Sequence, residues 1–169
     1  MKRYLVVGRL SEPEWVAEIA AHLRAVRPDV TADDWNRDAR AEGVEVPSIL
    51  DVYRLRDLAS QVEGRGPSLD GRFASLPLLP LSVWIPVDLP APKVPLFETK
   101  IDPVGLGSSQ ALLRELDALK PFVEAVTGPL DRRVDGDGVG AVWLALHRAA
   151  ELSIARHTAM MGFPDEAPT

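Results

Sequence analysis

Cysteine is absent from all 169 residues of the sequence. Its absence excludes a disulfide scaffold, zinc ribbons, thiolate clusters and a cysteine nucleophile. Histidine, aspartate and glutamate are the strong metal ligands that remain, and the chain has three histidines. We expect neither a metal ion nor another cofactor.

An excess of basic residues is also missing. The chain has 19 Lys and Arg against 25 Asp and Glu, which gives a formal net charge of −6. Residues 1–75 hold 11 basic against 13 acidic residues, and residues 76–169 hold 8 against 12. Neither half provides a basic platform for a phosphate backbone. We therefore expect no nucleic acid among the partners.

Long apolar runs are absent as well. No window of about 18 residues lacks both charge and proline, so the sequence predicts no membrane span. The apolar stretch near the N-terminus covers residues 4–7 and is too short for the core of a signal peptide. We expect a cytoplasmic protein without membrane contact.

Length and composition favour a single domain. With 46% hydrophobic residues, a chain of 169 residues can bury a core without metal or disulfide support. We expect the domain to span residues 1–163 and residues 164–169 to form a disordered tail. Apolar residues recur at helical intervals in five segments, and capping residues precede several of them. The five predicted helices cover approximately residues 12–26, 31–43, 48–64, 109–121 and 139–161. In an alternative interpretation, residues 122–126 continue the fourth helix after a kink at Pro121.

The proline-rich segment 76–97 is the most unusual part of the chain. It holds six prolines among twelve Leu, Val, Ile, Trp and Phe residues. Proline breaks helices and removes a donor from a sheet. We therefore expect extended chain, either as strands at a sheet edge or beside a bulge, or as a polyproline-like ribbon laid against the core. Predicted strands at about 81–87 and 94–101 join a first strand at 3–7. The sequence thus predicts an α+β fold, with about five helices packed on one face of a small, partly antiparallel sheet of about three strands.

Two tryptophans bear on partner binding. Trp35 stands among charged residues near Arg37, and these residue types frequently anchor protein interfaces. Trp84 and Val94 lie in the proline-rich segment, where apolar surface left after edge pairing suits a second chain. We predict these four residues as partner-binding residues. The alternative for both indoles is burial in the core of the same chain.

A glycine-rich turn provides a candidate anion site. Gly105, Gly107, Ser108 and Ser109 follow a predicted strand and open a helix, whose N–H groups and hydroxyls could bind a phosphate or carboxylate. Arg114 could support this anion site or the alternative interpretation that follows. In the alternative interpretation, Ser108 or Ser109 simply caps the helix, which contributes about 1 kcal/mol.

Two histidines have a glutamate one helical turn away. Glu18 precedes His22 by four residues, and His147 precedes Glu151 by four. Such pairs could form an acid–base couple or part of a metal site, although solvated pairs of this kind are common. No serine elbow, zinc-protease helix or Walker lysine loop accompanies them. We assign no catalytic residue.

Two functions remain by elimination. The first is a non-catalytic cytoplasmic protein-interaction domain, an adaptor or neutralising partner. It would bind another protein chain of unknown identity or form a homodimer through its proline-rich edge. The second is a small-molecule or nucleotide-binding enzyme with its anion site at residues 105–109. Convergence of Ser108, Ser109 and Arg114 on a pocket would favour the enzyme, and an exposed apolar surface around Trp84 would favour the interaction domain.

Overall fold

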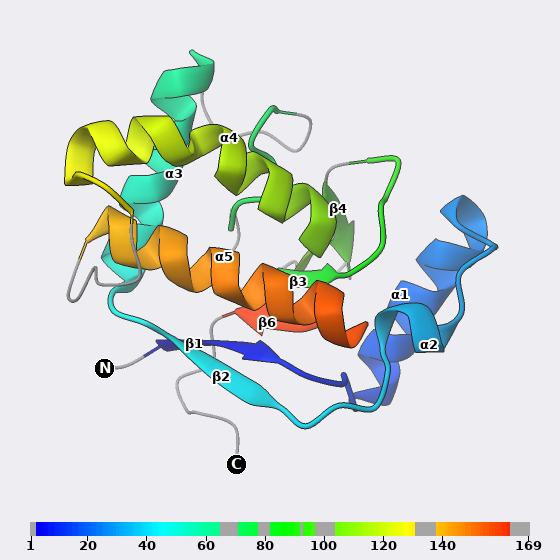
Figure 1. Cartoon of the computed structure of the whole chain (residues 1–169). Helices are drawn as coiled ribbons and strands as arrows, with labels where there is room; N and C mark the ends of the chain where they lie inside the picture. The colour runs from blue at the N-terminus through cyan, green and yellow to red at the C-terminus, as the bar shows by residue number, and fades with distance from the viewer. Residues whose placement is uncertain are drawn as a thin grey trace.

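The computed structural model describes residues 3–64, 71–77, 82–91, 93–96, 104–130 and 138–162. These residues form six strands and five helices (Figure 1). In chain order, the elements are β1 (Arg3–Val7), α1 (Pro13–Val26), α2 (Ala32–Trp35), β2 (Glu42–Val46), α3 (Ile49–Glu63), β3 (Ser82–Ile85), β4 (Lys93–Leu96), β5 (Val104–Ser108), α4 (Ser109–Thr127), α5 (Val139–Arg156) and β6 (Met160–Gly162).

The strands form one mixed sheet in the order β2-β1-β6-β3-β5-β4. β3 and β5 run parallel, and the other neighbouring pairs are antiparallel. The prediction of about three strands was wrong, because the described residues contain six. The missed strands lack the usual sequence signals: β2 is EGVEV, β5 is VGLGS, and β6 has three residues. Their neighbours in the sheet hold them extended in spite of weak β propensity.

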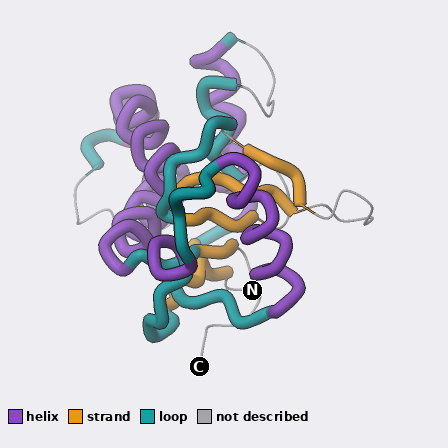
Figure 2. Tube along the Cα trace, turned by 90° about the vertical axis from the view of Figure 1, so that its right-hand side faces the viewer, coloured by secondary structure: helices purple, strands orange, loops and turns teal. Residues whose placement is uncertain are grey.

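Helices cover both faces of the sheet, whereas the sequence predicted them on one. α3, α4 and α5 pack on the first face, where Leu5, Val7 and Trp84 share a core cluster with apolar residues of these helices. On the second face, Ile19 and Leu23 of α1 cluster with β3, β4 and β5. Figure 1 shows α3, α4 and α5 above the sheet, and in Figure 2 the strands lie between two groups of helices.

The two strands of the proline-rich segment occupy different positions in the sheet. All four residues of β3 are buried, and this strand lies between β6 and β5. The predicted edge position was therefore wrong for β3. It holds for β4, the last strand of the sheet, where Pro95 pairs with Gly105. Pro86 follows directly after β3, where its missing N–H interrupts no strand pairing.

Three helices end at other residues than the sequence predicted. α2 ends at Trp35 instead of near Gly43, because Glu42 and Gly43 pair with β1 as part of β2. α4 continues through Pro121 to Thr127 as one helix. α5 ends at Arg156 instead of Met161, because His157 takes a left-handed conformation with φ of 53° and turns the chain toward β6. A Cβ atom at Gly162 of β6 would lie 3.0 Å from Leu5 Cδ2, so glycine allows this strand to fit beside β1.

The domain boundaries stay a prediction. The described residues share one sheet with core clusters on its two faces. The predicted tail, residues 164–169, lies outside the described residues.

Candidate functional site

Both tryptophans that we predicted to bind a partner lie in the core. Trp84 is fully buried, and its indole Nε1 donates a hydrogen bond to the carbonyl of Ser75 at 2.7 Å. Trp35 ends helix α2 and is 2% exposed. Neither indole is therefore accessible to another molecule. Both follow the alternative interpretation, in which they are buried in the core of the same chain.

Arg37 and Val94 are accessible but do not form one surface with Trp84. Arg37 is exposed, and its backbone N–H donates to the carbonyl of His157 at 2.9 Å. Val94 is half-buried on β4 and packs against the second core cluster, which contains Trp35. Trp84 belongs to the first cluster, on the other face. Partner binding by Arg37 or Val94 stays a prediction.

The glycine-rich segment forms a buried strand and the start of a helix. Gly105 and Gly107 are buried in β5. Ser108 is the N-cap of α4, and its Oγ accepts a hydrogen bond from the N–H of Ala111 at 3.2 Å. Ser108 therefore caps the helix, as in the alternative interpretation of the glycine-rich segment.

The remaining groups of the predicted anion site have partners within the chain. Ser109 Oγ lies 2.7 Å from Ser153 Oγ, which donates to the carbonyl of Thr158 at 2.6 Å. Arg114 forms an ion pair with Asp88 at 3.0 Å. The two hydroxyls and the guanidinium therefore do not converge on an open anion pocket.

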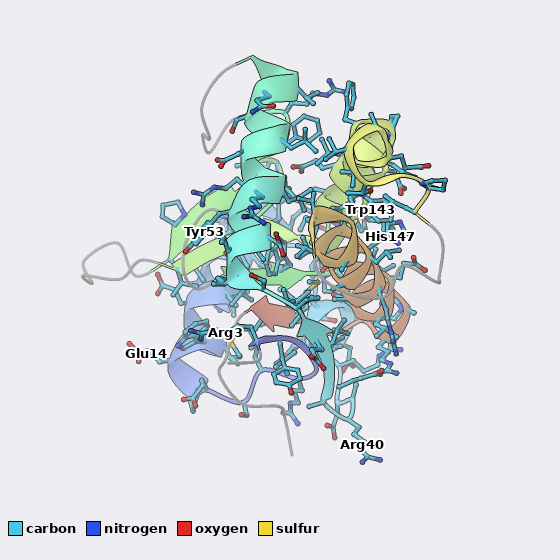
Figure 3. All side chains as sticks on the ribbon, turned by 90° about the vertical axis from the view of Figure 1, so that its left-hand side faces the viewer. Arg3, Glu14, Arg40, Tyr53, Trp143 and His147 are labelled. Atoms are coloured by element: carbon cyan, nitrogen blue, oxygen red, sulfur yellow. The ribbon has the colours of Figure 1, made fainter. Side chains whose placement is uncertain are left out.

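A histidine with two carboxylates lies on the outer side of the α4–α5 pair. His147 Nε2 lies 2.9 Å from Asp117 Oδ1 of α4, and His147 Nδ1 lies 2.5 Å from Glu151 Oε1, one turn along α5. The imidazole stacks on the ring of Trp143, with centroids 4.7 Å apart (Figure 3). The side chains of Asp117 and Glu151 are 61% and 59% exposed, whereas that of His147 is 23% exposed.

This arrangement restricts two exposed carboxylates at the same time. The imidazole is a rigid plane that contacts one carboxylate at each of its nitrogens. Trp143 supports the ring, and its own Nε1 donates to the carbonyl of Leu116 at 2.8 Å. Ionised carboxylates accept several hydrogen bonds each. Asp117 and Glu151 can therefore contact His147 and still receive cationic groups from another molecule.

The arginines of α5 pair with the sheet rather than with these carboxylates. Arg148 and Arg156 lie 3.1 Å and 2.8 Å from the carboxylate oxygens of Glu42 in β2. Within the described part of the chain, no lysine or arginine forms an ion pair with Asp117 or Glu151. Asp117 and Glu151 are therefore left without a basic partner among the lysines and arginines that the structure describes.

One of the two predicted histidine–glutamate pairs forms. His147 contacts Glu151, but His22 is half-buried and makes no ion pair with Glu18 in the residues described. The two pairs lie on elements that cover opposite faces of the sheet, so they do not share a site. Sequence reasoning missed Asp117, which is 30 residues from His147 and reaches it through the packing of α4 on α5.

A second group of carboxylates lies in residues 11–38, which hold seven acidic against three basic residues. A hydrogen bond from Arg27 holds the pKa of Asp29 below its ordinary value. The backbone N–H of Thr31 likewise lowers the pKa of Asp34. The exposed residues of this segment that make no ion pair with described residues include Glu12, Glu18, Asp33 and Asp38.

Neither a metal centre nor a membrane-spanning helix is found among the described residues. No three or more of their His, Asp and Glu side chains are grouped so that they could hold a metal ion. None of the helices in these ranges is both long enough and apolar enough to cross a membrane.

Residues 81–161 match the model of a family described as "Putative DNA-mimic protein". The matched segment is slightly less than half of the chain. It begins just before β3 and includes α4 and α5, with Asp117, His147 and Glu151. Searches among curated proteins and among solved structures gave no match.

The family match corrects the predicted function and partners, because it suggests a non-enzymatic protein that binds DNA-binding proteins. A protein partner is supported, but the unspecified adaptor or neutralising role and the homodimer built on the proline-rich edge were wrong. A nucleotide-binding enzyme with an anion site at residues 105–109 does not fit this match either. The prediction that nucleic acid has no bearing on the partners was also wrong, because a DNA-mimic family implies partners that bind DNA. Acidic composition argues against binding phosphates, but it suits a surface that imitates them.

Proposed function

We propose that the chain acts as a DNA mimic, a non-catalytic protein that occupies the DNA-binding surface of a DNA-binding protein. The observation that carries this proposal is the match of residues 81–161 to the DNA-mimic family. DNA-binding proteins contact the backbone mainly through Lys and Arg side chains that pair with phosphates. Carboxylates on a folded surface offer these side chains negative charge and acceptor oxygens.

Asp117 and Glu151 are the carboxylates that fit this role best. Both lie inside the matched segment, and both are more than half exposed. Neither forms an ion pair with a lysine or arginine in the described part of the chain. A cationic side chain of the partner would therefore not have to displace one that belongs to this chain.

We assign His147 as a positioning residue for this surface. Fixing a side chain on binding costs about 0.5–1.5 kcal/mol when the side chain is free to rotate beforehand. His147 contacts both carboxylates and is itself held against Trp143. The two carboxylate side chains are thus partly ordered in the unbound protein, so fixing them on binding costs less free energy. This lower cost supports a role for His147 in tight binding of the partner.

The acidic residues of the N-terminal segment support the proposal at longer range. With a net charge of −6, the chain attracts basic surfaces before contact, and salt screens this attraction. Exposed carboxylates such as Glu12, Glu18 and Asp33 contribute to the field. We expect the association rate to fall as salt is added. We also propose that the protein is cytoplasmic, because DNA-binding proteins meet DNA in that compartment.

Displacement from immobilised DNA tests the proposal. Proteins of a cell extract are bound to DNA-cellulose, the purified chain is added, and each released protein is identified and purified. The partner should then bind either labelled DNA or this chain, but not both together, as measured by fluorescence anisotropy. The proposal fails if the chain releases nothing beyond what an unrelated protein of equal negative charge releases.

Single isosteric variants test the α4–α5 surface separately. Asp117→Asn and Glu151→Gln should each raise the concentration needed for half-displacement by about twofold to fivefold, as expected for an exposed ion pair. Asp57→Asn on α3 is the matched control, because it also removes one exposed charge but lies outside the matched segment. Equal effects of all three variants would mean that total charge, and not this surface, governs binding.

A further inference from the structure

A groove lies between α1 and the segment that follows β1. It has a volume of about 550 Å³. The residues that line it and matter to the argument are Arg9, Leu10, Pro13, Val16, Ala17 and Ala20. Small-molecule sites commonly have volumes of about 300–1,000 Å³ and mostly apolar linings with a few polar groups. α1 lies at the right of Figure 1, on the side that faces the viewer in Figure 2.

The two walls of the groove are fixed without a ligand. Pro13, Ala17 and Ala20 recur every three or four residues, so they share one side of α1. On the opposite wall, Asn36 holds Leu10 in place. Its Oδ1 accepts from the N–H of Leu10 at 2.7 Å, and its Nδ2 donates to the carbonyl of Leu10 at 3.0 Å. The groove is therefore a preformed apolar surface.

Among the described residues that line the groove, Arg9 has the only charged side chain. It is exposed and makes no ion pair or hydrogen bond through its side chain with the residues that the structure describes. A guanidinium binds a carboxylate through two parallel hydrogen bonds. The groove thus places an exposed guanidinium beside an apolar lining, which is complementary to a ligand that has both a negative group and an apolar body.

We propose that this groove binds a small aliphatic carboxylate. Its carboxylate pairs with Arg9, and its hydrocarbon body lies along Leu10, Val16 and Ala17. The proposal concerns binding alone, without a reaction. It goes beyond DNA mimicry and does not depend on it, because the groove is formed by residues outside the segment 81–161.

Octanoate and octanol form a matched pair of probes, since they share an alkyl chain and differ in charge. Each is titrated into the full chain, and NMR signals of Leu10, Ala17 and Ala20 are followed. We expect saturable shifts with octanoate and tighter binding of octanoate than of octanol. Arg9→Gln should lower the affinity for octanoate by about twofold to fivefold, as expected for the loss of an exposed ion pair, and leave the affinity for octanol unchanged.

Two further variants control this experiment. Arg40→Gln removes another exposed arginine that does not line the groove, and it should leave both affinities unchanged. Ala17→Leu fills the groove and should abolish the shifts caused by either probe. The proposal is overturned if octanoate gives no saturable shifts at these residues, if Arg9→Gln weakens both probes equally, or if octanol binds as tightly as octanoate.

Discussion

Asp117 of α4 and His147 of α5 lie 2.9 Å apart at Oδ1 and Nε2, although 30 residues separate them in the chain. The other nitrogen of the same ring contacts Glu151. The contact therefore couples a carboxylate of each helix to one imidazole. Because α4 and α5 pack against each other in the first core cluster, the spacing of the two carboxylates follows from the packing of the core.

Replacing His147 should show whether partner binding depends on its positioning of Asp117 and Glu151 and not only on the charge of these carboxylates. His147→Ala leaves both carboxylates in place but removes their common contact and the stacking on Trp143. We expect a loss of about 1 kcal/mol in the free energy of unfolding, measured by urea denaturation, because a stacked ring pair contributes about 0.5–1.5 kcal/mol. The variant should also need a higher concentration to displace a partner from DNA.

His22→Ala is the control for this variant. His22 is half-buried on α1 and makes no hydrogen bond or ion pair in the described part of the chain. It should leave displacement unchanged. An unaltered displacement curve for His147→Ala would contradict its positioning role, whatever the change in stability.

Trp84 should act on stability rather than on recognition. Trp84→Phe leaves the carbonyl of Ser75 without its donor and opens a cavity in the first core cluster. We expect a loss of about 2–4 kcal/mol in the free energy of unfolding. Phe122→Ala, at a site 42% exposed, should change it by less than about 0.5 kcal/mol. Similar urea midpoints for the two variants would show that Trp84 is not a core residue.

The helices could be predicted wherever a cap precedes an apolar period. Ser48 Oγ accepts from the N–H of Leu50 at 3.2 Å and begins α3, and Ser108 begins α4 in the same way. The strands could not be predicted equally well, because β2, β5 and β6 depend on their neighbours. Gly105 and Gly107 predict a turn, yet they pair with Ser82 and Trp84 in the interior of the sheet.

In the candidate site, too, contacts between residues close in sequence could be predicted, and contacts between distant residues could not. The spacing of His147 and Glu151 is a local pattern, and the sequence predicted their pairing as one option. Asp117 joins them only when α4 packs on α5, and no spacing in the chain indicates that contact. Burial of Trp35 and Trp84 depends in the same way on which elements cover them.

Asp51 should hold the start of α5 against α3. Its side chain is 5% exposed, and its oxygens accept from the N–H of Gly138 at 3.0 Å and from Arg54 at 2.9 Å. Asp51→Ala leaves that N–H without its acceptor, so we expect a loss of about 1–3 kcal/mol in the free energy of unfolding. Amide exchange at Gly138 should also become faster. Asp57→Ala, at an exposed site of the same helix, should change neither quantity appreciably.

Asp34 should make the start of α2 sensitive to acid. Its carboxylate accepts from the N–H of Thr31 at 2.8 Å and from Thr31 Oγ1 at 3.1 Å. These bonds favour the ionised form and lower the pKa of Asp34 below its ordinary value of 3.8. Since the folded-state pKa is the lower one, the stabilisation is fully present above the unfolded-state pKa and is lost as the pH falls through the folded-state pKa.

The N–H signal of Thr31 reports this transition in an NMR titration. We expect it to shift with a midpoint below pH 3.8, because the hydrogen bond to Asp34 weakens as the carboxylate gains a proton. Asp34→Asn should abolish the transition, whereas Asp33→Asn should keep it, because Asp33 makes no hydrogen bond to Thr31 within the described residues. A midpoint at or above 3.8, or a transition that persists in Asp34→Asn, would contradict the assignment of this carboxylate as the acceptor for the N–H of Thr31.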